Sequence, residues 1–268
     1  MKTAIKKIMM KILSSIVGKK KLQKFFEPLF LLSLRGLNYG NGGDFKESGE
    51  LNVLKLVKNK FNNEKSLIIF DVGGNAGNYS KALSEFFKSK AIIHSFEPSK
   101  KTYELFLETT KHIKNIIPNN CGFSDTENYQ LLYTNQDGSG IASIYHRKLE
   151  HFGISMDKSE QIKLSTIDAY CKINQIDRIH FLKLDIEGHE LKALNGAAKM
   201  INSKKIDIIQ FEFGGCNIDS RTYFQDFFYL LKDNYRIFRI LKDGLFEILT
   251  YKETYEIFIT INYLAIKK

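Results

Sequence analysis

The sequence predicts an α/β protein built on a mostly parallel sheet. After residue 50, short apolar runs alternate with stretches of helical periodicity, and this alternation predicts parallel strands joined by right-handed helical crossovers. The first apolar run, residues 67–70, ends in an acid and a glycine-rich turn over residues 71–77. The second, residues 91–96, ends in Glu97 and Pro98. Polar groups at the ends of neighbouring strands are typical of α/β sheets that bind a ligand at that edge.

The remaining elements follow the same alternation. Strands are expected near residues 67–71, 91–97, 115–122, 179–185 and 206–213, and helices near residues 76–88, 99–112, 188–201 and 220–232. Two further strands, 235–241 and 257–266, are expected to form a hairpin at the edge of the sheet. Between residues 125 and 168 the pattern changes to two short strands, 129–133 and 161–165, separated by turn residues. An insertion at the open edge of such a sheet is a usual place for substrate contacts.

Residues 1–50 are expected to form a helical basic leader that precedes the main domain at residues 51–268. Apolar residues recur at helical spacing from Ile5 to Ile16, with lysines off that stripe. Eight lysines precede the first acid, Glu27, and the net charge of +10 falls to about +2 when they are set aside. A nearly neutral body does not support a groove that follows nucleic-acid phosphates, so no nucleic-acid partner is expected.

Two interpretations of the leader stay open. A basic amphipathic helix can lie at a membrane surface, where each lysine near anionic lipid contributes ~1 kcal/mol, so residues 2–24 are candidates for peripheral contact with the inner membrane face. The same stripe can instead pack on the main domain as a cap over its site. No apolar run approaches the ~20 residues needed to span a bilayer, and three cysteines without a Cys-x-x-Cys pair suit a reducing, cytoplasmic compartment.

The glycine-rich turn departs from the dinucleotide fingerprint G-x-G-x-x-G. When the motif is aligned with Gly73 as its first glycine, its second and third glycines are replaced by Asn75 and Asn78. The second glycine lets the backbone touch a pyrophosphate, so the side chain of Asn75 disfavours such a ligand. A ligand with a ribose but no phosphates fits better, and S-adenosylmethionine is a common one. The carboxylate of Glu97 is well placed to accept hydrogen bonds from ribose hydroxyls.

Five segments resemble, in order and spacing, the FkbM family of S-adenosylmethionine-dependent methyltransferases; they are residues 71–77, 96–98, 123–125, 181–190 and 211–212. The pattern Lys-x-Asp-x-Glu-Gly-x-Glu, which begins at Lys183, is the most specific of them. The resemblance extends from Leu67 to the C-terminus and departs at Gly74, where the family usually has alanine. It implies a Rossmann-like class I methyltransferase sheet, with the last hairpin supplying the reversed seventh strand.

The strand ends and the resemblance together predict the cofactor site. We expect the methionine part over the glycine turn, the ribose at Glu97 and the adenine near the end of the third strand. The expected cofactor-binding residues are Asp71, Gly73, Gly74, Asn75, Gly77, Glu97, Ser124 and Asp125.

Carboxylates at the ends of the central strands are expected to face the transferred methyl group, where one can act as a general base. The catalytic candidates are Lys183, Asp185, Glu187 and Glu212, whereas Glu190 is expected to cap the following helix. Carboxylates also suit Mg²⁺, but Lys183 is the simpler way to balance their charge, so no metal ligand is assigned.

The expected function is S-adenosylmethionine-dependent O-methylation of a sugar, glycan or related polyhydroxylated metabolite. The insertion offers polar side chains for such an acceptor, namely Ser139, Ser143, Tyr145, His146 and Arg147. One alternative is an NAD-dependent oxidoreductase, which Asn75 and Asn78 argue against. The other is a non-catalytic binding module on the same fold, which the acids Glu97, Asp185 and Glu187 argue against. The oligomeric state is not predicted.

Overall fold

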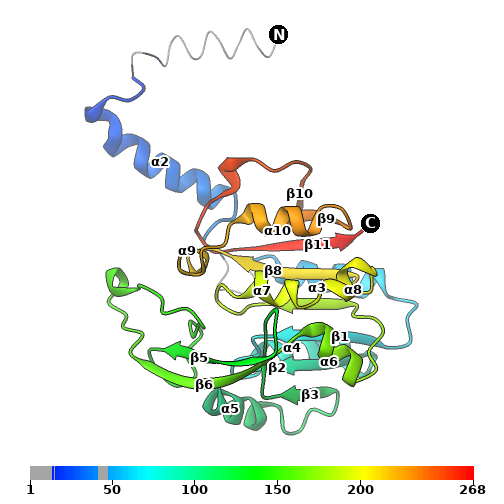
Figure 1. Ribbon diagram of the computed structural model, residues 1–268. Helices are drawn as coiled ribbons and strands as arrows, with labels where there is room; N and C mark the ends of the chain where they lie inside the picture. The colour runs from blue at the N-terminus through cyan, green and yellow to red at the C-terminus, as the bar shows by residue number, and fades with distance from the viewer. Residues whose placement is uncertain (1–13, 15, 42–47) are drawn as a thin grey trace.

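The structure, a computed structural model, describes residue 14 and residues 16–41 and 48–268. The expected stripe from Ile5 to Ile16 lies outside these residues except for Ile16. The described part of the leader is helical, as expected, and consists of η1 (Lys20–Leu22) and α2 (Gln23–Gly36). Figure 1 shows α2 projecting away from the rest of the molecule. In the described part of the chain, no helix combines the length and apolar character that a membrane span requires.

An eight-stranded sheet forms the centre of the molecule, in the order β10-β9-β11-β8-β7-β1-β2-β3 (Figure 1). Its strands are β1 (Leu67–Val72), β2 (Ala91–Phe96), β3 (Ile116–Asn119), β7 (Phe181–Leu184), β8 (Ile208–Phe213), β9 (Tyr235–Leu241), β10 (Gly244–Ile248) and β11 (Ile261–Lys267). The five strands from β3 to β8 are parallel, and β11 runs antiparallel between β8 and β9. The α/β class, the mostly parallel sheet and the reversed strand implied by the resemblance are therefore confirmed.

The hairpin at the sheet edge differs from the expected one. Residues 235–241 and 257–266 were expected to form it, and β9 and β11 do pair. However, β11 lies inside the sheet, and the edge is the short strand β10, which pairs with β9. Because β10 is short and follows a tight turn, only its pairing with β9 distinguishes it from a loop.

Helices cover both faces of this sheet. One layer contains α3 (Glu50–Lys60), α4 (Asn78–Phe87) and α5 (Lys100–Thr110), and the other contains α6 (Ile167–Ile173), α7 (Glu190–Asn195), α8 (Ala198–Asn202) and α10 (Phe224–Leu231). Neighbouring residues of β1 point into different layers, Ile69 toward α3 and α4 and Phe70 toward α6, because side chains alternate along a strand. The expected helix at 188–201 is divided into α7 and α8, and α6 was not expected. The short elements are α9 (Cys216–Ser220), η2 (Lys88–Lys90), η3 (Glu150–Phe152) and η4 (Glu253–Tyr255).

The insertion forms a second, smaller sheet. Its strands are β4 (Gly122–Phe123), β5 (Asn128–Thr134) and β6 (Lys158–Ser165), in the order β4-β6-β5. The two short strands expected there are thus confirmed. This sheet has its own apolar cluster of Leu132, Ile162 and Leu164, and Figure 1 shows it beside the main sheet.

Candidate active site

A cleft lies between the carboxyl ends of the central strands and the small sheet. Its polar side contains Gly73, Asn75, Glu97, Asp185 and Glu187, which follow β1, β2 and β7. Its apolar side is formed by Leu132, Ala142, Ile144, Ile162 and Leu164 from the insertion. A cleft with one apolar and one polar wall suits a ligand that combines a flat aromatic part with hydroxyl groups.

The glycine turn closes one end of this cleft. Gly73 has φ +90°, and a Cβ there would lie 1.9 Å from the carbonyl oxygen of Asp185, so only glycine fits. The backbone N–H of Asn75 donates to Glu97 Oε2 at 3.0 Å, and its Nδ2 donates to the carbonyl oxygen of Ser139 at 3.0 Å. The turn is therefore tied both to the end of β2 and to the insertion.

Gly74 follows in the same turn, and the structure explains its departure from the usual alanine. A Cβ at Gly74 would lie 2.9 Å from the Phe106 ring of α5. The bulky aromatic ring of this chain thus occupies the space that an alanine methyl group would need. Gly77, with φ +87°, is the residue at which the turn passes into α4.

Glu97 is buried at the tip of β2. Its Oε1 accepts a hydrogen bond from the backbone N–H of Ser99 at 2.9 Å, and its Oε2 accepts the one from Asn75. Burial raises the pKa of this carboxyl to about 7, although the two backbone donors oppose the rise. A carboxylate has about four acceptor positions, so two remain for the hydroxyls of a ligand.

A second hollow adjoins the cleft on the other side of the glycine turn. Its charged residues are Glu50, Lys183 and Asp185, and Tyr79 forms part of its wall. Lys183 Nζ donates to Asp185 Oδ2 at 2.7 Å and lies 4.3 Å from the centroid of the Tyr79 ring. Burial lowers the pKa of Lys183, but the acids Asp185, Glu50 and Asp71 outweigh burial and raise it. Lys183 is therefore a buried cation.

Glu50 is a site residue that sequence reasoning missed. It lies at the start of α3, at the expected boundary between leader and domain, and is 6% exposed. Gln210 Nε2 of β8 donates to its Oε1 at 2.7 Å. Burial raises the pKa of Glu50, while Lys183 lowers it. No helix was expected at residues 50–60, and nothing in the local sequence pointed to Glu50.

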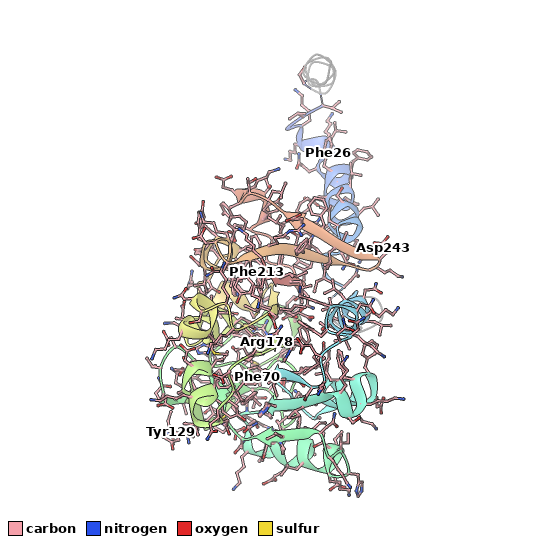
Figure 2. All side chains as sticks on the ribbon, turned by 90° about the vertical axis from the view of Figure 1, so that its right-hand side faces the viewer. Phe26, Phe70, Tyr129, Arg178, Phe213 and Asp243 are labelled. Atoms are coloured by element: carbon pink, nitrogen blue, oxygen red, sulfur yellow. The ribbon has the colours of Figure 1, made fainter. Side chains whose placement is uncertain are left out.

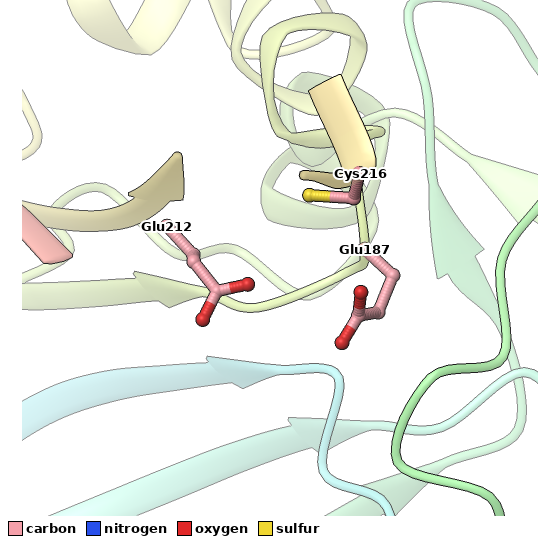
Figure 3. A group of neighbouring side chains, drawn as sticks. All are labelled: Glu187, Glu212 and Cys216. Atoms are coloured by element: carbon pink, nitrogen blue, oxygen red, sulfur yellow. The ribbon is translucent and has the colours of Figure 1, made fainter. Parts of the chain in front are cut away.

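The structure brings Glu187 and Glu212 together, with Cys216 beside them (Figure 3). Within the described residues, one oxygen of each carboxylate and the Cys216 sulfur lie within 4.8 Å of one another. Arg147 Nη1 of the insertion donates to Glu187 Oε2 at 2.5 Å. Burial raises the pKa of Glu212, and the neighbouring charges of Asp185 and Glu187 raise it further. Burial also raises the pKa of Glu187, against the lowering effect of Arg147.

This cluster does not fit a magnesium ion. Mg²⁺ prefers oxygen ligands, whereas the third group here is the thiol of Cys216, and burial raises its pKa so that it stays protonated. Arg147 and Lys183 already provide positive charge to Glu187 and Asp185. We therefore assign no step to a metal.

Asp71 serves as an anchor beneath the site. It is fully buried and does not line the cleft or the hollow. Its Oδ2 accepts from Ser80 Oγ at 2.5 Å, and Ser80 Oγ lies 2.7 Å from Ser95 Oγ. This chain of hydrogen bonds joins β1, α4 and β2, and so holds the glycine turn in place.

Ser124 and Asp125, expected near the adenine, do not line the cleft. Asp125 forms an ion pair of 2.6 Å with Lys192 on α7, and this contact holds the Asp125 side chain outside the cleft. Ser124 Oγ lies 3.0 Å from Nε2 of His189, and the other ring nitrogen of His189 lies 3.0 Å from the Tyr145 hydroxyl. His189, which the sequence did not favour, lines the cleft; burial lowers its pKa to about 4, so it is neutral near pH 7.

The insertion contacts the loop after β7 through more than one residue. Ser143 Oγ donates to the carbonyl oxygen of Glu187 at 2.7 Å, in addition to the Arg147 contact. His146 instead packs against the Tyr133 ring of β5. Glu190 accepts hydrogen bonds from the backbone N–H groups of Ile186 and Gly188 at 2.9 and 3.0 Å, so its side chain holds the loop before α7 instead of capping that helix as expected.

Comparisons with known proteins identify the family of this chain. The family model of the methyltransferase FkbM domain matches residues 71–242. Hexuronic acid methyltransferase AglP of Haloferax volcanii is 26% identical over 167 residues, which cover 62% of this chain. The aligned part spans 64% of the length of that relative, less than two thirds.

Two solved structures are also similar. Methyltransferase FkbM from Methylobacillus flagellatus KT is 20% identical with a TM-score of 0.44, covering 75% of this chain and 44% of that one. The O-methyltransferase from Bacillus cereus in complex with SAH is 9% identical with a TM-score of 0.43, covering 97% of both chains. The family model covers more than half of this chain, and the protein therefore belongs to the FkbM methyltransferase family.

Proposed function

We propose that this protein is an S-adenosylmethionine-dependent O-methyltransferase that acts on a hydroxyl of a sugar, glycan or related polyhydroxylated metabolite. The observation that carries the proposal is the junction of the cleft and the second hollow, which share Gly73, Asn75 and Asp185. One side of this junction suits an adenosine, and the other suits an amino acid. S-adenosylmethionine, when bound, supplies a methyl group on a positively charged sulfur.

The adenosine half matches the cleft. Glu97 retains acceptor positions for ribose hydroxyls, and Asn75 keeps its carboxylate oriented. The apolar wall from β5 and β6 offers Leu132, Ile162 and Leu164 to the adenine ring. Asn75 also carries a side chain at the position of the second glycine of the dinucleotide fingerprint, and this supports the adenosyl ligand over NAD.

The amino-acid half matches the second hollow. A free amino acid carries a carboxylate and an ammonium group at neutral pH, and the hollow offers groups of both signs. Lys183 is positioned to bind the carboxylate and Glu50 the ammonium. Buried charges need partners of opposite sign, so a zwitterion is well suited to a hollow that contains both.

Methyl transfer requires the acceptor oxygen, the methyl carbon and the sulfur to lie in line, and such alignment can supply ~7–11 kcal/mol of the barrier. Asp185 lies at the junction and orients the acceptor hydroxyl. Glu187 accepts the hydroxyl proton as the oxygen–carbon bond forms and the carbon–sulfur bond breaks. A positioned base of this kind contributes ~10²–10⁴-fold to the rate. Burial raises the pKa of Glu187 to about 8 although Arg147 lowers it, so the ionised base becomes available as the pH rises toward 8.

A sugar acceptor is supported by the insertion and by one relative. Ser143 and Arg147 bring polar groups to the edge of the catalytic cluster, where hydroxyl-rich ligands find hydrogen-bond partners. The relative from Haloferax volcanii is a hexuronic acid methyltransferase. An acidic or neutral sugar is therefore the first acceptor class to test.

Calorimetry with S-adenosylmethionine and with NAD tests the cofactor assignment. We expect the first to bind and the second not to, and we expect Glu97→Ala to weaken the binding while the fold remains intact. The Asp177→Asn variant, whose side chain is 95% exposed, is a matched control. Binding of NAD alone, or an unchanged affinity in Glu97→Ala, would remove this site from consideration.

Labelled methyl transfer to a panel of sugars and uronic acids tests the reaction. With an active acceptor, Asp185→Asn should reduce turnover about 10²-fold through misalignment while it changes cofactor affinity much less. If the wild-type protein binds the cofactor but methylates no hydroxyl acceptor, the binding-module alternative gains support.

A further inference from the structure

Helix α2 exposes five large apolar side chains, those of Phe25, Leu29, Phe30, Leu31 and Leu32. Phe25, Leu29 and Leu32 are 62%, 44% and 66% exposed, and Leu34 is the only buried residue of the helix. With 3.6 residues per turn, these three side chains lie on one side and Leu34 roughly half a turn away. Phe25, Leu29 and Leu32 therefore form an apolar stripe opposite the buried Leu34, and Phe30 and Leu31, 59% and 55% exposed, extend the apolar surface around the helix. Figure 2 shows this part of α2, labelled at Phe26, standing clear of the body.

The helix is firmly held at its C-terminal end. Asn38 Nδ2 donates to the carbonyl oxygen of Ile240 at 3.0 Å, and the Gly40 N–H donates to that of Thr260 at 2.9 Å. Tyr39 is 1% exposed, with its ring under the guanidinium of Arg239. The helix thus projects from a fixed base beside β9 and β11, so its apolar stripe is presented in a defined direction.

The charge around this stripe is mostly positive. Lys19, Lys20, Lys21 and Lys24 are exposed at or just before the start of α2, and Glu27 is the only acid in the described residues 16–41. Four more lysines precede them in the sequence. A second copy of this helix would bring like charges together, whereas an anionic lipid surface accepts both the lysines and the apolar side chains.

We propose that α2 docks this protein on an anionic lipid surface. Phe25, Leu29 and Leu32 enter the boundary between headgroups and acyl chains, and the four lysines contact the anionic headgroups. This surface is separate from the cleft, so the proposal does not depend on the identity of the substrate. Large exposed apolar patches on soluble domains commonly mark such interaction sites.

Co-sedimentation of the full chain with vesicles tests the proposal. We expect binding to vesicles that contain phosphatidylglycerol, weak binding to pure phosphatidylcholine, and a decrease in binding with added salt. The triple variant Phe25→Ser, Leu29→Ser and Leu32→Ser should bind at least about tenfold more weakly, because it removes the apolar contacts. Replacement of Lys20, Lys21 and Lys24 by Gln should abolish the preference for anionic lipid.

A matched control makes the same kind of change elsewhere. Phe152, Ile173 and Leu249 are 69%, 74% and 79% exposed, and their replacement by Ser should leave vesicle binding unchanged. Light scattering without lipid tests the alternative occupant of this surface, a second copy of the protein. A dimer that dissociates in the α2 triple variant, or vesicle binding that the triple variant retains, would overturn the proposal.

Discussion

Arg147 and Glu187 form a buried ion pair across the cleft edge, with Nη1 and Oε2 2.5 Å apart. Their side chains are 10% and 17% exposed. They come from different parts of the fold, Arg147 from the insertion and Glu187 from the loop after β7. Glu187 has φ 52°, a left-handed conformation that is uncommon for a residue with a side chain. The pair therefore holds an acid in a defined position beside Glu212, at the place where we propose that the proton is accepted.

Replacement of Arg147 by Ala should cost about 1–3 kcal/mol of folding free energy, because it removes the charged hydrogen bond to the buried carboxyl of Glu187. Arg147 also lowers the pKa of Glu187, so its loss should move the rising limb of the pH–turnover profile to higher pH. Thermal unfolding and turnover against pH measure the two effects. Adding Glu187→Gln should recover much of the lost stability but not the turnover. An unshifted pH profile in the single variant would argue against Glu187 as the base.

Cofactor binding should weaken as the pH falls through about 7. The raised pKa of Glu97 means that the carboxylate, the better acceptor for ribose hydroxyls, is present above this pH and is lost below it. If binding requires the ionised form, affinity falls up to about tenfold per pH unit below the pKa. Calorimetry between pH 6 and pH 8 measures this dependence. The Glu97→Gln variant should bind weakly with a flat profile, and a pH dependence that persists in this variant would assign the effect to another group.

Lys183 should distinguish ligands that carry an amino acid from those that do not. We expect Lys183→Gln to weaken binding of S-adenosylmethionine about tenfold or more, since a charged hydrogen bond contributes ~1.5–3 kcal/mol. Binding of 5′-methylthioadenosine, which lacks the amino acid, should change little. Competition between the two ligands provides the measurement.

Lys183 lies among Asp185, Glu50 and Asp71, so its replacement can also disturb the fold. Glu50→Gln provides a second variant with a smaller change. Because Glu50 is proposed to bind the ammonium group, this variant should also weaken binding of S-adenosylmethionine and leave binding of 5′-methylthioadenosine nearly unchanged. Equal losses of affinity for both ligands in both variants would contradict the assignment of the hollow to the amino-acid half.

Much of the site follows from local sequence. The turn from Gly73 to Gly77 and the acids Glu97 and Asp185 stand directly after apolar runs, and the carboxyl ends of parallel strands meet at one edge of a sheet. Such features need only the periodicity and order of the chain.

Other features depended on contacts between distant residues. Asp125 was expected in the cleft, but its partner Lys192 is 67 residues away and holds it elsewhere. The position of β11 inside the sheet likewise depends on pairing with both β8 and β9.

The amino-acid sequence by itself determined the α/β class, the glycine turn and the acids at the strand ends, because strand periodicity and turn chemistry are local properties. Only the tertiary structure decided that Glu50 joins Lys183, that Arg147 pairs with Glu187, and that the small sheet forms the apolar wall. Glu50 and its partner Gln210 are 160 residues apart, and burial at that contact raises the pKa of Glu50. The exposure of α2 was decided in the same way, because burial is a property of the whole packed chain.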